Sequence, residues 1–368
     1  MFNEKEALER VSAKLKRTGA RIGDKIPCKT INGVYDDYTN AIEGWTNGFW
    51  AGILWLMHRY TKEKSYADLA NGVETKLDNA LRDFYCLHHD VGFMWHISAV
   101  ANYKLTGDKA SAKRGFIAAS VLASRFNPAG SFIRAWNGDN LEGWAIIDCM
   151  MNLPILYWAS DYIKDPRFYN VAQTHAETTM KNFIREDGSV KHICKFNPVS
   201  GEYVENYYGQ GYSTESSWSR GTAWALYGFS LSSKYTGRQD FIETAKKVAD
   251  FFISHLPEDK VPFADLAAPK EINIHKDSSA AAIAASGLLL LSKLLKENER
   301  EYYFNAAKKI VSSLYDNYTD WEGDEALIIK GNTAFHAKEQ SDLETSLIYG
   351  DYFFLEALMQ LNGYEELF

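Results

Sequence analysis

A two-helix unit that recurs five times along the chain constrains the fold more than any other feature. In each unit an apolar, aromatic segment with helical period is followed by a short polar turn and a more charged amphipathic segment. Most of these turns contain Gly, Asp or Pro, which is typical of places where one helix ends and the next begins. The predicted pairs are 46–60 with 65–84, 90–105 with 109–126, 144–163 with 167–184, 219–235 with 239–255, and 278–297 with 301–318.

Two single helices, predicted at 4–18 and 347–361, would form a sixth pair if the two ends of the chain meet. The first member of each pair is apolar all round, as in a helix buried on both sides, whereas the second is amphipathic, as in an outer helix. Alternating strand patterns are nearly absent. The predicted fold is therefore all-α, an (α/α)6 barrel made of a double ring of six helical hairpins. An open solenoid is the alternative. No linker is recognisable, so we expect one catalytic domain over 1–368.

The longer segments of the chain all precede predicted inner helices. They cover 19–45, 126–143, 185–218, 256–277 and 318–345 and hold much of the Trp, His and Asn. In a closed ring they would share one mouth of the barrel, and loops carried by a rigid scaffold are where functional residues concentrate. We therefore expect the site at that mouth.

Charge and targeting signals exclude several classes of partner. The net charge is −8 and there is no run of Lys or Arg, which argues against nucleic acid, because such partners need a clustered cationic surface. No stretch approaches the roughly 18 apolar residues of a membrane span, and the charged N-terminus does not resemble a signal peptide. Four scattered cysteines without a CxxC pattern disfavour a zinc site and fit a reducing compartment. We expect a cytoplasmic protein with no membrane partner.

Asp90 follows two histidines, His88 and His89, at the start of a predicted helix. A metal site is disfavoured because adjacent residues point in different directions and no distant Cys/His set completes the shell. Capping of the helix by the Asp90 carboxylate is an ordinary structural role for such a residue. Acid/base catalysis is the third interpretation, and capping does not exclude it. We expect no metal and no cofactor.

Asp148 lies among Ile146, Ile147, Cys149 and Met150, close to the start of a long apolar segment. A carboxylate in such surroundings loses hydration, which favours its protonated form and suits a general acid. Pairing with a buried Arg or a Trp indole is the alternative. Two carboxylates delivered by separate elements, amid aromatic residues, are what acid/base chemistry on a sugar requires.

Three further positions are candidates for ligand binding. Arg220 begins a predicted helix, where a cation is electrostatically misplaced, so it serves either an anion in the mouth or an ion pair with a loop carboxylate. His192 and Gln210 lie in the 185–218 segment and could hydrogen-bond a ligand, although each, taken alone, is more often an ordinary loop residue with water for a partner.

Six segments in order resemble the unsaturated glucuronyl hydrolases of glycoside hydrolase family 88. Any one of these segments is weak evidence for the resemblance, but together they span nearly the whole chain. They are Trp45–Trp50, His88-His89-Asp90-Val91-Gly92-Phe93, Ile146-Ile147-Asp148-Cys149 with Asn152-Leu153-Pro154, Trp218-Ser219-Arg220-Gly221 with Trp224, Asp277-Ser278-Ser279-Ala280, and Tyr349-Gly350-Asp351-Tyr352 with Leu355-Glu356-Ala357-Leu358. The family fold is an (α/α)6 barrel, in agreement with the helix count.

The resemblance implies an unusual hydrolysis. Such enzymes hydrate the C4=C5 double bond that polysaccharide lyases leave on a non-reducing uronic acid, and so release that sugar from glycosaminoglycan di- or oligosaccharides. Asp148 would be the general acid/base, and Asp90 would hold ring hydroxyls and stabilise developing positive charge. The implied substrate-binding residues are Trp45 and Trp136, which would stack on sugar faces, His89, His192 and Gln210, which would form hydrogen bonds, and Arg220 and Trp224, which would lie near the sugar carboxylate.

One stretch departs from part of the family. Members that favour sulfated disaccharides carry a Ser-x-x-Ser-x-Lys pattern shortly before the Tyr349-Gly350-Asp351 equivalent, whereas this chain reads His336-Ala337-Lys338-Glu339-Gln340-Ser341-Asp342-Leu343-Glu344. Its acidic residues would repel a sulfate, so we predict a weak preference for sulfated substrates or a preference for unsulfated ones.

Three alternatives to this function are open. An unsaturated rhamnogalacturonyl hydrolase would keep the chemistry and act on pectin fragments. A sugar epimerase or isomerase with a helical toroid would depend instead on paired histidines near the axis. A carbohydrate-binding protein would bind uronates without turnover.

Overall fold

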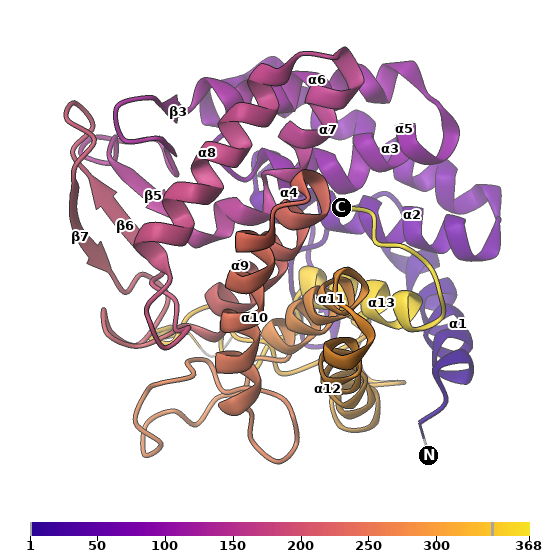
Figure 1. The fold of residues 1–368 in the computed structure, drawn as a ribbon. Coiled ribbons are helices and arrows are strands. Elements are labelled where there is room, and N and C mark those ends of the chain that lie inside the picture. The colour runs from indigo at the N-terminus through magenta and orange to yellow at the C-terminus, as the bar shows by residue number, and fades with distance from the viewer. Residues whose placement is uncertain (1, 340–341) are drawn as a thin grey trace.

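Helical hairpins form two concentric rings in the computed structural model, which describes residues 2–339 and 342–368 (Figure 1). The predicted pairing of an inner with an outer helix is confirmed. The inner ring consists of α2 (Phe49–Thr61), α4 (Val91–Trp95) with α5 (Ala101–Thr106), α7 (Pro154–Ile163), α9 (Ser219–Thr236), α11 (Ser278–Leu294) and α13 (Ile348–Leu361). The outer ring consists of α1 (Glu4–Ile22), α3 (Lys64–Arg82), α6 (Lys109–Ser124), α8 (Pro166–Phe183), α10 (Gln239–Ser254) and α12 (Glu297–Asn317).

Burial separates the two rings as their hydropathy predicts. Every residue of α9 from Ser219 to Ser233 is buried, and so is every residue of α11 from Ser278 to Ser292. By contrast, α10 buries only a stripe that faces the core. Gly287 of α11 lets the two inner helices approach closely, because a Cβ atom there would lie 2.9 Å from the Cβ of Tyr227 on α9.

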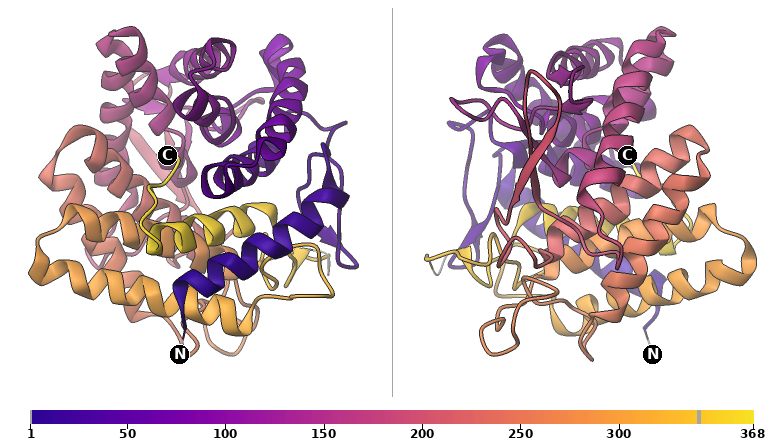
Figure 2. Two further views of the ribbon diagram at one scale, coloured as in Figure 1. Left: turned by 90° about the vertical axis from the view of Figure 1, so that its right-hand side faces the viewer. Right: turned by 60° about the vertical axis from the view of Figure 1, so that its left-hand side comes forward.

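The ring closes through the two ends of the described chain. α13 packs against both α11 and α2, and α1 packs on the outside of α13. The Asn362 amide, just after α13, donates to the Glu4 carbonyl at 3.0 Å. The left view of Figure 2 shows α1 and α13 side by side. The two single helices thus form the sixth hairpin, and the closed barrel is confirmed over the open solenoid.

The last residues of the chain cover one end of the barrel. The left view of Figure 2 places the C-terminus in the middle of the ring. The Phe368 side chain is fully buried and stacks on His96, with ring centroids 5.5 Å apart. The Lys104 ammonium group donates to the Leu367 carbonyl at 3.1 Å. This end is therefore closed, and the opposite end is the mouth.

The longer segments meet at that mouth, as predicted. Hydrogen bonds join each of them to another. They run from Tyr35 N to Glu325 Oε2 (2.9 Å), from Gln210 Nε2 to the Thr333 carbonyl (2.6 Å), from Tyr212 N to Asp265 Oδ2 (3.0 Å) and from Asn127 Nδ2 to the Pro198 carbonyl (2.9 Å). Tyr35 Oη also donates to Asp351 Oδ2 of the inner helix α13 at 2.8 Å.

The helix predicted over 144–163 is wrong in its first half. Residues Trp144–Ile146 form the strand β5, Ile147–Met151 form a 3₁₀ turn (η4), and the helix α7 begins only at Pro154. Proline has no backbone N–H and suits the first position of a helix, so it separates α7 from the residues before it. Asp148 therefore lies on a short irregular segment rather than at the start of a long helix.

The prediction that strands are nearly absent also needs correction. β5 pairs antiparallel with β6 (Ile193–Phe196), which pairs with β7 (Tyr203–Tyr207), so the 185–218 segment holds a hairpin beside the mouth. Shorter pairs join β1 (Thr30–Ile31) to β2 (Val34–Tyr35) and β3 (Phe126–Asn127) to β4 (Phe132–Ile133). The remaining short turns are η1 (Trp45–Gly48), η2 (Phe84–Cys86) and the π turn η3 (His96–Val100), which interrupts the predicted helix over 90–105.

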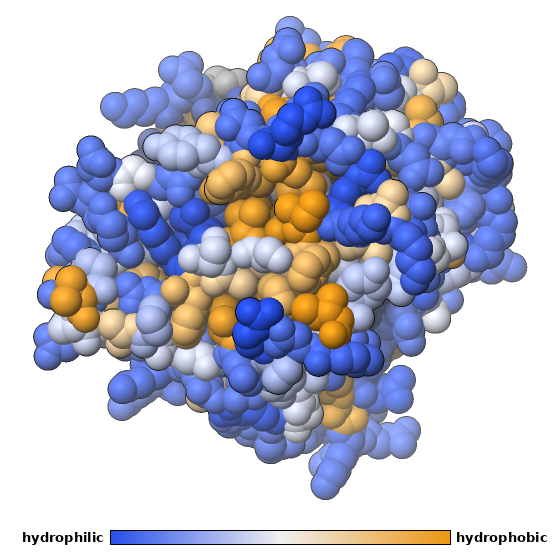
Figure 3. Space-filling view, turned by 90° about the horizontal axis from the view of Figure 1, so that it is seen from above, coloured by the Kyte–Doolittle hydropathy of each residue, from blue (hydrophilic) through white to orange (hydrophobic). Residues whose placement is uncertain are grey.

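The face at the top of Figure 1 is hydrophilic around a central apolar area (Figure 3). The outer helix α6 lies on this side and leaves Ile117 exposed. Among the described residues, no helix is both long and apolar enough to cross a membrane.

Candidate active site

The Asp90 carboxylate lies at the N-terminal end of α4 but does not cap that helix. Asp90 occupies the N-cap position without a side-chain hydrogen bond to the helix amides. Its Oδ2 atom instead lies 3.3 Å from His88 Nδ1 and 3.3 Å from His89 Nε2. The capping interpretation is therefore wrong for the carboxylate, which remains available for chemistry.

The two histidines and Asp90 converge, contrary to the expectation that consecutive residues point apart. One ligand atom from each of the three residues lies within 4.8 Å of the others. Burial lowers the pKa of His88 to about 4 and that of His89 well below its usual value, so both imidazoles are neutral at physiological pH. Neutral imidazoles beside a carboxylate can assist a substrate or ligate an ion. The absence of a metal remains a prediction.

Asp148 is close enough to Asp90 to influence the protonation of Asp90. The pKa of Asp90 is raised well above its usual value, chiefly by burial and then by the negative charge of Asp148. Asp90 can therefore hold a proton at a pH where an isolated aspartate holds none.

Asp148 projects from η4, and its side chain is 16% exposed. Its Oδ2 atom is buried and has no hydrogen-bond partner among the described residues. The Nε2 atom of His192 lies 3.5 Å from this oxygen. The structure therefore does not show the pairing with Arg or a Trp indole that we considered as an alternative.

Hydrogen bonds orient the His192 ring toward Asp148. The backbone N–H of Gln210 donates to His192 Nδ1 at 2.9 Å. Nδ1 also lies 3.1 Å from the carbonyl oxygen of Tyr208. These two contacts hold the ring with its Nε2 atom toward Asp148. The ring also packs on Trp218, with centroids 4.4 Å apart.

Trp45 and Trp136 both lie at the mouth and are half-buried. Trp45 packs on Tyr349, with ring centroids 4.9 Å apart, and Trp136 lies edge-on to His89 at 6.1 Å. In the same segment, Gly48 permits the close approach to an inner helix that its small size suggests, because a Cβ atom there would meet the carbonyls of Phe93 and Met94.

Arg220 is already bonded within the protein. Its side chain is 2% exposed and pairs with Asp277 at 3.2 Å. It also donates to the backbone carbonyls of Asn332 and Thr333. The structure therefore supports the interpretation in which Arg220 forms an ion pair with a carboxylate.

Gln210 and Trp224 likewise contact protein groups. The Gln210 side chain donates to the Thr333 carbonyl at 2.6 Å, the same acceptor that Arg220 uses. Trp224 is fully buried and packs on Phe93, with ring centroids 5.1 Å apart, while its indole N–H has no partner among the described residues.

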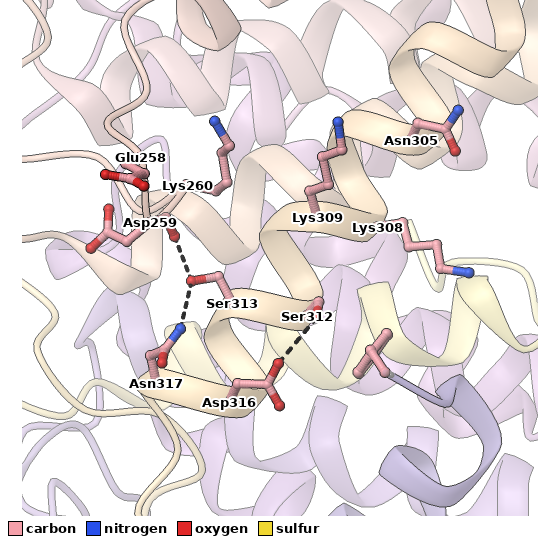
Figure 4. A pocket seen from close by; sticks show the side chains of 11 residues that line it. Glu258, Asp259, Lys260, Asn305, Lys308, Lys309, Ser312, Ser313, Asp316 and Asn317 are labelled. Atoms are coloured by element: carbon pink, nitrogen blue, oxygen red, sulfur yellow. Dashed lines mark hydrogen bonds between the residues drawn. The ribbon is translucent and has the colours of Figure 1, made fainter.

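A hollow of about 640 Å³ opens elsewhere, between α12 and the segment after α10 (Figure 4). Its walls carry Lys260 and Lys309 with Asp259 and Asp316, and its described lining includes none of the residues discussed above. The hollow lies on the outer ring, so the candidate site is located by its converging carboxylates and imidazoles rather than by the size of a cavity.

Comparison with known proteins shows the family of this chain. Residues 21–353 match the model of Glycosyl Hydrolase Family 88. The chain belongs to this family. It is 37% identical to the unsaturated glucuronyl hydrolase of Bacillus sp. (strain GL1), over 93% of this chain and 92% of that protein. It is 33% identical to the unsaturated chondroitin disaccharide hydrolase of Streptococcus agalactiae serotype III (strain NEM316), over 99% and 92%.

Solved structures of family members superpose closely. The unsaturated glucuronyl hydrolase of Bacillus sp. GL1 matches with a TM-score of 0.91 and 34% identity, over 98% of this chain and 97% of that one. An Asp→Asn variant of the Streptococcus agalactiae enzyme, in complex with dGlcA-GalNAc6S, matches with a TM-score of 0.86 and 30% identity, over 99% and 93%.

Reasoning from the sequence assigned no catalytic role to two residues that lie near the carboxylates. His88 contacts Asp90, and Asn152 contacts both Asp90 and the backbone of Asp148. The signal for Asn152 was its place in the Asn152-Leu153-Pro154 motif, directly before the proline that starts α7.

Proposed function

We propose that this protein releases the 4,5-unsaturated uronic acid from the non-reducing end of lyase-generated glycosaminoglycan oligosaccharides. The observation that carries the proposal is the pair of carboxyl groups at the mouth, in which the charge of Asp148 and burial together raise the pKa of Asp90. The chain belongs to a family whose relatives carry names for this activity on glucuronyl and chondroitin substrates.

The reaction begins with proton transfer from Asp148 to C4 of the unsaturated sugar. The C4=C5 π electrons form the new C4–H bond, and the positive charge that develops at C5 is shared with the ring oxygen. A water molecule then forms a bond to C5 and returns a proton to the Asp148 carboxylate, which regenerates the acid. The resulting hemiketal opens by cleavage of the C5–O5 bond. The free O5 hydroxyl leaves C1 as a hemiacetal, which collapses to an aldehyde and releases the remaining sugar.

The neighbouring groups support these steps. His192 Nε2 lies 3.5 Å from Asp148 Oδ2 and would keep the Asp148 side chain in place during these steps. Asp90 and His89 would contact ring hydroxyls, and Trp45 and Trp136 would stack on sugar faces. Near the sugar carboxylate, Arg220 would act through the Asn332 and Thr333 segment that it holds, together with Gln210.

The sequence and the structure also bear on whether the protein prefers sulfated substrates. Lys29, a cation near the acidic stretch that begins at His336, is paired with Asp342 at 2.6 Å. Lys338 is exposed beside Glu339, and Gln340 and Ser341 lie outside the described residues. We keep the proposal that sulfated disaccharides are not preferred. The pectin-directed activity differs only in substrate, so a panel that includes pectin-derived disaccharides separates the two.

Loss of the ultraviolet absorbance of the C4=C5 bond tests the proposal. We expect this absorbance to fall when the protein meets unsaturated disaccharides from hyaluronan or chondroitin. Asp148→Asn should fold with an unchanged thermal midpoint and lose at least about a hundredfold in kcat. Wild-type turnover in that variant would remove Asp148 from its role. Activity that depends on His89 and His192 but not on Asp148 would favour the epimerase alternative, and uronate binding without absorbance loss would favour a binding protein.

We also propose a cytoplasmic location, because the four cysteines are unpaired and scattered, as suits a reducing compartment. Fractionation of the source cells, followed by immunodetection, would test it, and recovery outside the cytoplasmic fraction would contradict it.

A further inference from the structure

The two catalytic carboxyl groups come from segments far apart in the sequence, and one side chain touches both segments. Asn152 follows η4, the turn that carries Asp148, and its side chain is fully buried. Its amide nitrogen donates to Asp90 Oδ1 at 3.3 Å and to the Asp148 backbone carbonyl at 3.3 Å. Its amide oxygen accepts from the backbone N–H of Phe93 at 2.8 Å.

These contacts fix which end of the amide faces which partner. The Phe93 N–H can only donate, so it requires the amide oxygen. The Asp148 carbonyl can only accept, and the ionised Asp90 carboxylate can only accept, so both require the amide nitrogen. A flipped amide would lose all three bonds. The side chain is therefore held in one orientation by both segments.

Asn152 also does for α4 what an N-cap side chain would do. Phe93 is the third residue of α4, and its N–H is one of the amides at a helix start that have no partner within the helix. Asp90 occupies the capping position but does not bond this amide. Because the Asn152 oxygen satisfies Phe93, the Asp90 carboxylate is free to face the mouth.

The backbone is shaped for this contact. Gly92 lies in the first turn of α4, directly against Asn152. A Cβ atom at Gly92 would lie 2.5 Å from Asn152 Cα and 2.6 Å from its Oδ1 atom. Any side chain at position 92 would therefore push η4 away from α4 and separate the two carboxylate-bearing segments.

We propose that Asn152 is a positioning residue for the hydration reaction, which caps α4 in place of Asp90 and sets the spacing of the Asp90 and Asp148 carboxyl groups. It acts through these two residues and does not itself touch the reacting atoms. The proposal rests on the proposed function for its kinetic readout, and a measurement that needs no turnover is included so that the two can fail separately.

Asn152→Ala tests the capping part of the proposal. Without the amide oxygen, Asp90 can turn and accept from the Phe93 N–H, so we expect kcat to fall at least about tenfold with KM changed less than about threefold. Asn102→Ala is the matched control, because Asn102 is also buried and donates to three side chains, those of Asn71, Glu74 and Ser111, away from the mouth. The control should lose thermal stability and keep kcat. Wild-type kcat in folded Asn152→Ala would overturn the proposal.

Asn152→Asp keeps the shape and the acceptor for Phe93 but replaces the donor to Asp90 with a carboxylate oxygen. We expect it to fold, to lose kcat about tenfold or more, and to move the alkaline limb of the kcat profile to higher pH, because the carboxyl pair holds its proton more tightly. A wild-type profile in this variant would overturn the proposal.

Carbon-13 NMR of aspartate carboxyl groups provides the readout without turnover. With the Asp90 signal assigned by its loss in Asp90→Asn, we expect its titration in Asn152→Asp to move to higher pH than in the wild type. An unchanged Asp90 titration would overturn the role of Asn152 whether or not the protein acts on unsaturated uronates. A shifted titration in a protein without turnover would support Asn152 and count against the proposed function alone.

Discussion

Loss of the Arg220 guanidinium should cost stability before it costs substrate binding. The family resemblance implies that Arg220 lies near the sugar carboxylate. In the structure the side chains of Arg220 and Asp277 are 2% and 0% exposed and pair at 3.2 Å. Removal of the arginine leaves the Asp277 carboxylate buried without its cation, and leaves the Asn332 carbonyl without this donor.

The size of the effect follows from that burial. Removal of one partner from a buried ion pair costs about 3–5 kcal/mol, because the remaining charge stays out of water. With an unfolding entropy of about 2.1 cal/mol/K per residue, this loss lowers the thermal midpoint of a chain of 368 residues by about 4–6 °C. Arg220→Met, which keeps the apolar stem of the side chain, should show most of the same decrease.

Calorimetry of the single and double variants would separate the ion pair from other effects. Asp277→Asn keeps an oxygen that can accept from the Ala280 N–H and so retains the cap of α11. The double variant Arg220→Met with Asp277→Asn should lose less stability than the sum of the two singles, by at least about 1 kcal/mol. Arg167→Ala, which removes an exposed arginine paired with Asp165 on the surface, is the control and should leave the midpoint unchanged.

A thermal midpoint at the wild-type value in Arg220→Ala, together with a large rise in KM, would refute this reasoning. That outcome would mean that the guanidinium serves the sugar carboxylate directly and that Asp277 is stabilised by other groups.

Three further predictions concern pH, metals and sulfate. Burial raises the pKa of Glu356 to about 7 from 4.5, so the contribution of Glu356 to stability is present below pH 4.5 and is lost as the pH rises through 7. Glu356→Gln should therefore flatten the dependence of the thermal midpoint on pH between about pH 5 and pH 8. An unchanged slope in scanning calorimetry would contradict this prediction. Dialysis against EDTA should leave kcat unchanged, whereas activity lost on dialysis and restored by zinc would assign a metal to His88, His89 and Asp90. In the absorbance assay, unsulfated chondroitin disaccharide should turn over at least as fast as its 6-sulfated form, and the reverse order would show that Lys338 or His336 accepts the sulfate.

The barrel could be predicted from the sequence because its helices are long and strongly periodic. The inner helices α9 and α11 are buried all round, and that pattern is visible in hydropathy alone. The number of hairpins and the position of the mouth followed from the order of the segments. None of this required a contact between residues distant in the sequence.

The segment around Asp148 could not be predicted in the same way. β5 is three residues long, too short for an alternating pattern, and it pairs with β6 about fifty residues later. Apolar residues from 144 to 151 therefore matched a helix pattern as well as a strand. Pro154 was the available signal for a break, because a proline inside a helix interrupts its hydrogen bonds. The convergence of His88 and His89 on Asp90 depends on the conformation of a turn, which cannot be predicted from the periodicity of apolar residues.

The residues that the family resemblance marks do two different kinds of work in the structure. Asp90, Asp148 and His192 lie where regular structure is interrupted, at a helix start, on a 3₁₀ turn and at the entry to a strand. Arg220 and Gln210 meet instead at one carbonyl, that of Thr333. Two side chains from separate elements that share one acceptor tie the Asn332 and Thr333 segment to the barrel. Substitutions at these two positions should therefore change substrate affinity through the position of this segment, whereas substitutions at the first three should change the chemical step itself.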